Sequence, residues 1–325
     1  MSFDRLVPDM ILPAVEAVSG CRLTSLLLAL PSYINRVYEL RAVDGTKLIA
    51  KFYRPGRWSR DAILDEHGFV ADCHEAEIPV VPAMTLRNGS VIDEHEGFLL
   101  SIFPKRAGRQ LEIVNDADWS RLGSLIARVH LCGGKRPAPH RVTIDPGQSL
   151  LADVYYLRDH IVPERFREQY ISGCMRLIET SAPLFSGLEK IRIHGDCHRG
   201  NILDRLEEGL LLIDFDDMAM GPPVQDLWLL LPDRADKSSR EIELFLQGYE
   251  RFRAFDRASL RCIEPLRAMR MVYFLAWCSR QAGDAQFRKN FPDWGSDRFW
   301  QNEVNDLREQ MEFMPENNVL KSNLF

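Results

Sequence analysis

The sequence has no long apolar segment. Its longest candidate, residues 227–231, falls far short of the ~18 apolar residues that a membrane-spanning helix needs. The first residues lack the basic and apolar blocks of a signal peptide. The seven cysteines occur singly, without a Cys-x-x-Cys pair, in a chain too large to need disulfide staples. We therefore expect a cytoplasmic protein with reduced thiols and no membrane partner.

An excess of positive charge is also missing. The chain has 41 basic and 47 acidic residues, a net charge of -6, and so no overall field that would attract nucleic acid. We expect no nucleic-acid partner, and a nucleotide would need cations that the fold places locally.

The first hundred residues have the pattern of a small antiparallel unit. One helix is predicted over residues 5–19 and another over residues 59–75, with Ser59 as its N-cap. Hairpin signals at Asp44-Gly45 and Asn88-Gly89 separate extended apolar segments. Five strands are expected, at residues 22–30, 36–41, 47–53, 80–86 and 97–103.

Helices dominate the rest of the chain, after a break at residues 104–108. They are predicted at residues 116–132, 150–159, 163–184, 242–255 and 259–281. Two short apolar runs, residues 191–194 and 209–215, are expected to pair as a small sheet. The pattern indicates an α+β chain with a first unit over residues 1–103 and a larger, mainly helical one over residues 104–325.

The strongest functional signal lies at His194-Gly195-Asp196-Cys197-His198-Arg199-Gly200-Asn201, followed by the apolar run that ends in Asp214. Phosphoryl transfer requires a carboxylate that orients the acceptor hydroxyl and oxygen ligands for Mg2+. Asp196 suits the first role, and Asn201 with Asp214 the second, so Asp214 counts as both a catalytic and a metal residue. A single loop acid more often caps a turn, but the joint spacing is typical of protein-kinase-like enzymes.

A kinase also needs a cation on the third strand and an acid on the following helix that holds it. Lys51 lies in the strand predicted at residues 47–53, and Glu66 in the helix that follows. Each residue alone would usually be a solvated surface group. Their position before the catalytic motif favours an ion pair at the ATP phosphates, with Asp65 as the alternative partner of Lys51.

The sequence contains no Gly-x-Gly-x-x-Gly, so the glycine-rich flap of protein kinases is absent. The turn over residues 30–35 is the remaining candidate, because Ser32 and Asn35 offer a hydroxyl, an amide and backbone N–H groups to phosphate oxygens. Ordinary turn residues are an equally good interpretation. Phe103, at the predicted hinge of residues 103–108, is expected to contact the nucleotide.

The chain resembles a known family, the bacterial stress response kinase A proteins, which are serine/threonine protein kinases with an aminoglycoside-phosphotransferase-like fold. The resemblance spans nearly the whole sequence and rests on the blocks at residues 32–38, 51–55, 57–58, 194–198, 221–228 and 264–270. It implies a bilobal protein-kinase-like fold, ATP and Mg2+ as cofactors, Asp196 as proton acceptor and Ser32 at the ATP phosphates. It also implies a cytoplasmic monomer that acts in a stress response.

One departure from the kinase pattern is Asp216, which replaces the glycine that usually ends the Asp-Phe-Gly motif. This carboxylate and Asp217 beside it are expected to bind metal or to face water. Few residues remain before the next helix near Asp226, so we expect no phosphorylated activation segment. Asp226 is expected either to cap that helix or to hydrogen-bond the backbone of the catalytic loop, and His194 is interpreted as a brace of this loop.

The predicted reaction transfers the γ-phosphate of ATP to a Ser or Thr hydroxyl of a protein whose identity the sequence does not give. Two alternatives stay open: a small-molecule kinase, which an acidic acceptor pocket would favour, and a nucleotide-binding pseudokinase. The acceptor is expected over the C-terminal helices, where Glu264, Arg267, Arg270 and Tyr273 recur at helical spacing. Salt bridges within the chain are the simpler interpretation of these four.

Overall fold

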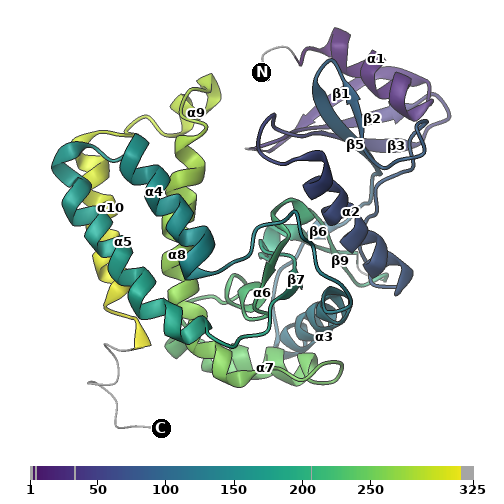
Figure 1. Cartoon of the computed structure of the whole chain (residues 1–325). Coiled ribbons are helices and arrows are strands. Elements are labelled where there is room, and N and C mark those ends of the chain that lie inside the picture. Colours follow the sequence, from purple (N-terminus) through teal and green to yellow (C-terminus); the bar gives the residue numbers. More distant parts are fainter. Residues whose placement is uncertain (1–2, 4–5, 33, 206, 316–325) are drawn as a thin grey trace.

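The computed structural model describes residues 3, 6–32, 34–205 and 207–315. Figure 1 shows an antiparallel sheet with helix α1 (Pro8–Ser19) at one end of the molecule and a helical remainder at the other. This arrangement confirms the predicted α+β, two-lobed fold class. The domain division between residues 103 and 104 stays a prediction.

The N-terminal sheet has five strands in the order β1-β2-β3-β5-β4, and all neighbours are antiparallel. Their bounds are β1 Leu23–Leu30, β2 Arg36–Ala42, β3 Lys47–Phe52, β4 Asp93–His95 and β5 Phe98–Pro104. Apolar residues of α1, such as Val15, and of the sheet, such as Leu40 and Phe52, form one buried cluster. This packing makes the sheet a rigid base for β3, the strand that carries Lys51.

The prediction of a strand at residues 80–86 was wrong, although the expected number of five strands is right. Pro79 and Pro82 have no backbone N–H to give to a sheet ladder, which explains the interruption. Val80 forms only an isolated bridge with Leu212. The turn at Asn88-Gly89 is present, with Gly89 at φ 77°, and the strand that it precedes is β4.

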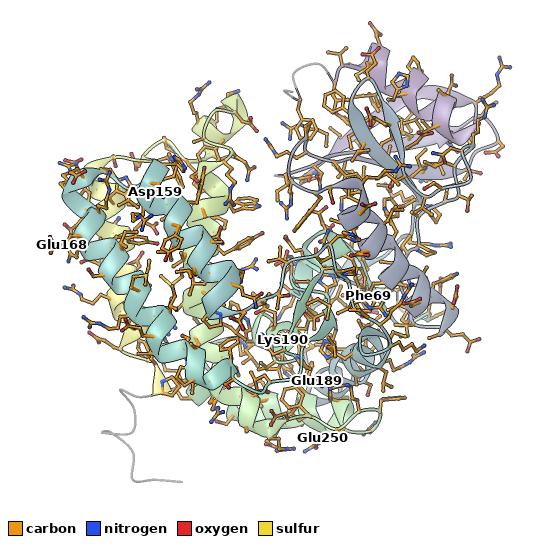
Figure 2. All side chains as sticks on the ribbon, in the orientation of Figure 1. Phe69, Asp159, Glu168, Glu189, Lys190 and Glu250 are labelled. Atoms are coloured by element: carbon orange, nitrogen blue, oxygen red, sulfur yellow. The ribbon has the colours of Figure 1, made fainter. Side chains whose placement is uncertain are left out.

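Helix α2 (Arg60–Glu75) connects the sheet to the helical part, as Figure 1 shows. It begins as predicted, because the Ser59 side chain accepts a hydrogen bond of 3.1 Å from the backbone N–H of Ala62. Phe69, labelled in Figure 2, packs edge-on against Phe215, with ring centroids 5.6 Å apart. Through this contact α2 packs directly against the segment that follows Asp214.

All five helices predicted beyond residue 104 are confirmed, with ends shifted by a few residues. The helices are α3 Asp116–Gly133, α4 Leu151–His160, α5 Glu164–Phe185, α6 Gln225–Trp228, α7 Ser239–Tyr249, α8 Ile263–Ser279, α9 Ala285–Asn290 and α10 Asp297–Met311. Figure 1 shows α4, α5, α8 and α10 side by side, with α3 and α7 below the centre. Among the described helices, none is both long and apolar enough to cross a membrane.

The predicted pairing of residues 191–194 with residues 209–215 was wrong. Strand β7 (Ile191–Ile193) pairs with β10 (Ala219–Gly221), whereas β9 (Leu210–Leu212) pairs with β8 (Ile202–Asp204). The tight turn between β8 and β9 makes them neighbours in a hairpin, which leaves β7 for the chain that returns after Asp214. Strand β6 (Arg109–Gln110) adds to β8. The catalytic motif therefore lies between two small sheets.

Candidate active site

The loop after β7 is held from below by Asp226. This carboxylate is fully buried and accepts hydrogen bonds from the backbone N–H groups of His194 (2.7 Å) and Gly195 (2.8 Å). A ring nitrogen of His194 lies 2.9 Å from the carbonyl oxygen of Ile213. Both residues therefore brace the loop, as the sequence predicted.

Gly195 is required by the backbone at this point. Its φ is 83°, in the left-handed region that favours glycine, and a Cβ there would lie 2.1 Å from the carbonyl oxygen of Asp217. At Gly195 the backbones of the catalytic loop and of the segment after Asp214 thus come into direct contact, and the rings of His194 and Phe215 also pack, with centroids 4.6 Å apart. A side chain at residue 195 would separate them.

Hydrogen bonds connect the segments that carry Asp196, Asn201 and Asp214. The Asn201 amide donates to the carbonyl oxygen of Asp196 at 2.9 Å, and the backbone N–H of Ile213, the neighbour of Asp214, donates to the carbonyl oxygen of Asn201 at 2.9 Å. Asp214 has φ 60° and ψ 69°, and its side chain is 55% exposed. The unusual backbone turns this carboxylate out of the strand and leaves it accessible to a ligand.

Lys51 reaches this group from β3. Its Nζ lies 2.9 Å from Asp216 Oδ1, 3.2 Å from Asp214 Oδ1 and 3.8 Å from Glu66 Oε1. Burial of the ammonium opposes its charge, but the three carboxylates outweigh burial and raise the pKa of Lys51 well above its usual value. The residue is therefore a fixed cation.

The predicted partner Glu66 is present, and the alternative partner Asp65 was wrong. Asp65 instead accepts from the backbone N–H of His140 at 2.9 Å, because it lies on a different face of α2 from Glu66. Burial raises the pKa of Glu66 to about 7, against the opposing charge of Lys51. Lys51 is closer to two other carboxylates, so its charge compensates Glu66 only in part.

Asp216 does not face water, contrary to one expectation from the sequence. Its side chain is buried and pairs with Lys51 and, at 3.3 Å, with Arg57. Burial raises its pKa, but the charges of these two cations outweigh burial and hold the pKa of Asp216 well below its usual range. The extra carboxylate is thus the main anchor of Lys51.

The two predicted turn residues, Ser32 and Asn35, differ in their environment. The Asn35 side chain is buried, donates to Asp216 Oδ1 at 3.0 Å and accepts from the backbone N–H of Arg54 at 3.1 Å. These bonds favour the structural interpretation of Asn35. Ser32 lies just before β2 and is partly exposed, whereas Tyr33 lies outside the described residues. A contact of Ser32 or Asn35 with phosphate stays a prediction.

Phe103 lies in β5, opposite Ile49 of β3, and is partly exposed. Its ring packs at 5.7 Å, centroid to centroid, against the ring of His67 on α2. The residue is therefore at the junction of the sheet with α2. Its contact with a nucleotide stays a prediction.

A second group of charged residues, which sequence reasoning did not assemble, lies around Asp196 and Asp217. Arg57 bridges Asp216 and Asp217, and the hydroxyl of Tyr273 donates to Asp217 Oδ1 at 3.1 Å. Arg270, one turn before Tyr273 on α8, binds Asp196. The regular spacing of Arg270 and Tyr273 was the available signal, but the sequence did not indicate which carboxylates they bind.

Glu264 and Arg267, the other two α8 residues that the sequence analysis singled out, form salt bridges within the chain. Glu264 pairs with Arg234 at 3.0 Å and with Arg267 at 3.3 Å. The simpler of the two sequence interpretations therefore holds for Glu264 and Arg267. Of the four residues, only Arg270 and Tyr273 bind carboxylates of the candidate site.

Asp214 and Asn201 offer oxygen ligands of the kind that hold Mg2+ in kinases. Within the described residues, no group of three or more His, Cys, Asp or Glu side chains has the geometry of a metal site. Mg2+, however, usually takes only one or two protein carboxylates and completes its shell with water and substrate phosphates. The exposed carboxylate of Asp214 and the amide oxygen of Asn201 meet that need.

The fold and these residues define a class of protein, the two-lobed kinase-like phosphotransferases. The model of the phosphotransferase enzyme family matches residues 27–263. The chain belongs to this family and, within it, to the stress response kinase A group. It is therefore an enzyme that transfers phosphate to a hydroxyl group.

Two curated relatives support the narrower grouping. The chain is 37% identical over 317 residues to "Stress response kinase A" of Escherichia coli, which covers 97% of this chain and 95% of that protein. It is 36% identical, over the same shares, to "Serine/threonine protein kinase RdoA" of Salmonella typhimurium.

Solved structures agree with the fold. An amicoumacin kinase in complex with AMP-PNP, Ca2+ and Ami has a TM-score of 0.75 at 19% identity, covering 94% of this chain and 95% of that one. A microcompartment-associated aminopropanol kinase has a TM-score of 0.70 at 16% identity, covering 96% and 97%. At these identities the likeness concerns the fold alone.

Proposed function

We propose that the protein is an ATP- and Mg2+-dependent serine/threonine protein kinase. The observation that carries the proposal is the convergence of Asp196, Asn201 and Asp214 opposite Lys51, which four buried or half-buried contacts hold in place. A kinase needs this combination of an acceptor-side carboxylate, oxygen ligands and a fixed cation.

Each residue has a separate role in the proposal. Asp196 orients the acceptor hydroxyl and accepts its proton, because it is the ionised carboxylate on the loop beside the acceptor side. Asn201 and Asp214 would hold Mg2+, which when bound neutralises charge on the phosphates. Lys51 binds the phosphates of ATP. Asp216 fixes Lys51, and Glu66 gives it a second, more distant support.

The choice of a protein acceptor follows the more similar relatives. The relatives at 36–37% identity include one named as a serine/threonine protein kinase. The structures of antibiotic and aminopropanol kinases are only 16–19% identical. Small hydroxyl compounds are the second candidate acceptors, since the fold itself is shared with those enzymes.

The remaining expectations belong to the same proposal. We infer two domains, residues 1–103 and 104–325, with ATP between them, and a monomer that acts in the cytoplasm during a stress response. Autophosphorylation would make the enzyme a phosphoprotein. A pseudokinase would lack turnover despite binding the nucleotide.

The test is transfer from labelled ATP by the purified protein, with Mg2+, to a generic protein acceptor and to a panel of small alcohols and aminoglycosides. The Asp196→Asn variant should bind ATP as the wild type does and lose transfer by about a hundredfold or more. Asp233→Asn is the matched control, because Asp233 lies in the same predicted domain and its half-exposed side chain contacts only its neighbours in sequence, the backbone N–H of Arg234 at 2.7 Å and Lys237 at 3.8 Å. Near-normal turnover of Asp196→Asn would refute the role of Asp196.

A further inference from the structure

A small cavity opens beside the catalytic loop. It measures about 110 Å³, and its wall includes Gly195, the neighbour of Asp196. Arg270, which binds Asp196, also lines it. A group bound in this cavity therefore lies next to Asp196, the carboxylate that is proposed to orient the acceptor.

The wall is mainly apolar. It is built by the segment before α4, by the start of β10 and by α8, and Trp58, from the turn after β3, contributes to it. Its apolar side chains are Trp58, Val142, Ile144, Leu150, Met218, Ala219, Leu266 and Met269. Such a surface gains free energy by covering an apolar group, and it offers little to a sugar or an ammonium ion.

The charged residues of the wall already have partners. Asp153 pairs with Arg280 at 3.2 Å, and Asp217 pairs with Arg57 and accepts from Tyr273. Arg270 is paired with Asp196. In the described part of the wall, no carboxylate is left over for a cationic amino alcohol or aminoglycoside. The acidic pocket that would have favoured a small-molecule kinase is therefore not what this site offers.

The size of the cavity also favours a single amino-acid side chain over a drug-sized molecule as its ligand. Sites for drug-sized ligands usually enclose about 300–1,000 Å³, whereas an apolar cavity of about 150 Å³ holds benzene. The cavity of about 110 Å³ is therefore sized for one branched aliphatic side chain. A drug-sized antibiotic could place only a part of itself inside it.

An apolar surface continues from the cavity along α8. One face of this helix carries residues three, four and seven positions after Arg270, which are Tyr273, Phe274 and Trp277. Phe274 is 46% exposed and stacks on Trp277, with ring centroids 5.3 Å apart. A polypeptide can cover both the cavity and this surface, which a small molecule cannot.

We propose that this cavity binds an apolar side chain of the acceptor protein, next to the Ser or Thr that is phosphorylated, so that the enzyme selects acceptor sites with a leucine-sized neighbour. The inference rests on the proposed protein kinase activity and specifies its substrate class.

The experiment uses the full-length enzyme, labelled ATP and Mg2+, and a set of Ser-containing peptides. The peptides are identical except for Leu, Ala, Lys or Glu at the position adjacent to the Ser on either side. For one of the two sides, kcat/KM for the Leu peptide should exceed that for the Ala, Lys and Glu peptides by about tenfold.

A substitution in the wall tests whether the cavity causes this selection. Val142 lines the cavity and is 42% exposed, so Val142→Trp can occupy the mouth without disturbing the core. The ratio of kcat/KM for Leu over Ala should fall close to one in this variant. Val142→Ala, which leaves the cavity open, should keep the preference. Val114→Trp is the matched control, because Val114 is 83% exposed and does not line the cavity, and it should behave as the wild type.

The outcomes separate this inference from the function on which it rests. If the wild type phosphorylates all peptides equally, or if Val142→Trp retains the preference at an unchanged melting temperature, the cavity inference fails and the kinase proposal stands. If only small alcohols are phosphorylated, the protein kinase proposal itself fails. A Leu preference that Val142→Trp removes and Val142→Ala keeps supports both.

Discussion

Arg270 on α8 holds one oxygen of Asp196, with its guanidinium nitrogen 2.7 Å from Oδ1. On the other side, the Asn201 amide donates to the backbone of Asp196, and His198 lies 3.4 Å from Oδ2. The carboxylate is therefore oriented before an acceptor arrives. Burial opposes its ionised form, but the hydrogen bond from His198 and the charge of Arg270 outweigh burial and hold the pKa of Asp196 well below its usual range.

Replacing Arg270 should change the pH dependence of transfer. In Arg270→Gln the pKa of Asp196 rises, because a charge that stabilises the ionised form is gone. Asp196 must be ionised to accept a proton, so the acidic limb of the kcat profile should move to higher pH. We also expect kcat at pH 7.5 to fall by about tenfold, because the orientation of the carboxylate is lost.

Arg270→Lys separates this role from a purely structural one. Lysine keeps the charge but not the planar fork of arginine, so it should restore the position of the acidic limb and only part of kcat. An acidic limb that is unchanged in Arg270→Gln would show that Arg270 does not act on Asp196.

Asp216 should matter more than Glu66 for the binding of ATP. Lys51 Nζ lies 2.9 Å from Asp216 and 3.8 Å from Glu66, so Asp216 sets its position. Asp216→Asn, which keeps the shape of the side chain, should lower kcat/KM for ATP by about tenfold or more, and Glu66→Gln by about threefold or less. Steady-state kinetics with varied ATP measure both, and the reverse order would contradict this assignment.

Part of this site was accessible from the sequence. Asp196 and Asn201 are five residues apart on one loop, and Lys51 follows a hairpin signal, so local spacing was enough to propose them. Glu66, a partner of Lys51, was also predicted, but the roles of Asp216 and Arg270 were not accessible in the same way. Asn35 and Asp216 bond across 181 residues of sequence, and Arg270 and Asp196 across 74. Such pairs depend on how the lobes pack, which no local pattern encodes.

The fold shows the same division. Long helices with a repeated apolar face, such as α3 and α5, were predicted within a few residues of their ends. Strands β7 to β10 have only three residues each, too few to display a period or to indicate a partner. The runs that contain β7 and β9 were found, but β8 and β10 were not, and the predicted pairing was therefore wrong.

The stability of the protein should depend on pH through Glu66. Burial raises the pKa of Glu66 to about 7 in the folded state, while an unfolded glutamate has a pKa of about 4.3. The contribution of Glu66 is therefore fully present below pH 4 and is lost as the pH rises through about 7. Glu66→Gln cannot ionise and loses nothing over this range.

The difference in the free energy of unfolding between the wild type and Glu66→Gln should accordingly change between pH 5 and pH 8. The free energy of unfolding of Glu66→Gln, relative to the wild type, should increase by on the order of 2 kcal/mol over this interval. Urea titrations at the two values measure it. A constant difference would mean that Glu66 is ionised at pH 5, with Lys51 compensating it fully.

Gly123 tests how tightly α3 and α7 are packed. In an exposed helix, Gly→Ala stabilises by about 1 kcal/mol, because alanine is the better helix former. A Cβ at Gly123, however, would lie 1.9 Å from the carbonyl oxygen of Phe245 on α7, and this backbone atom can yield only if the helices separate. The sign should therefore be reversed, and Gly123→Ala should lower the free energy of unfolding by about 1–3 kcal/mol.

Gly283→Ala is the control, since a Cβ there meets no atom within 4 Å and Gly283 does not have a positive φ. It should change the free energy of unfolding by less than about 0.5 kcal/mol. Transfer activity in Gly123→Ala should fall mainly with the folded fraction, because a Cβ at Gly123 meets Phe245 and Tyr249, and neither residue is proposed to bind ATP, Mg2+ or the acceptor. An unchanged or higher melting temperature for Gly123→Ala would show that α3 and α7 pack less closely than the 1.9 Å approach requires.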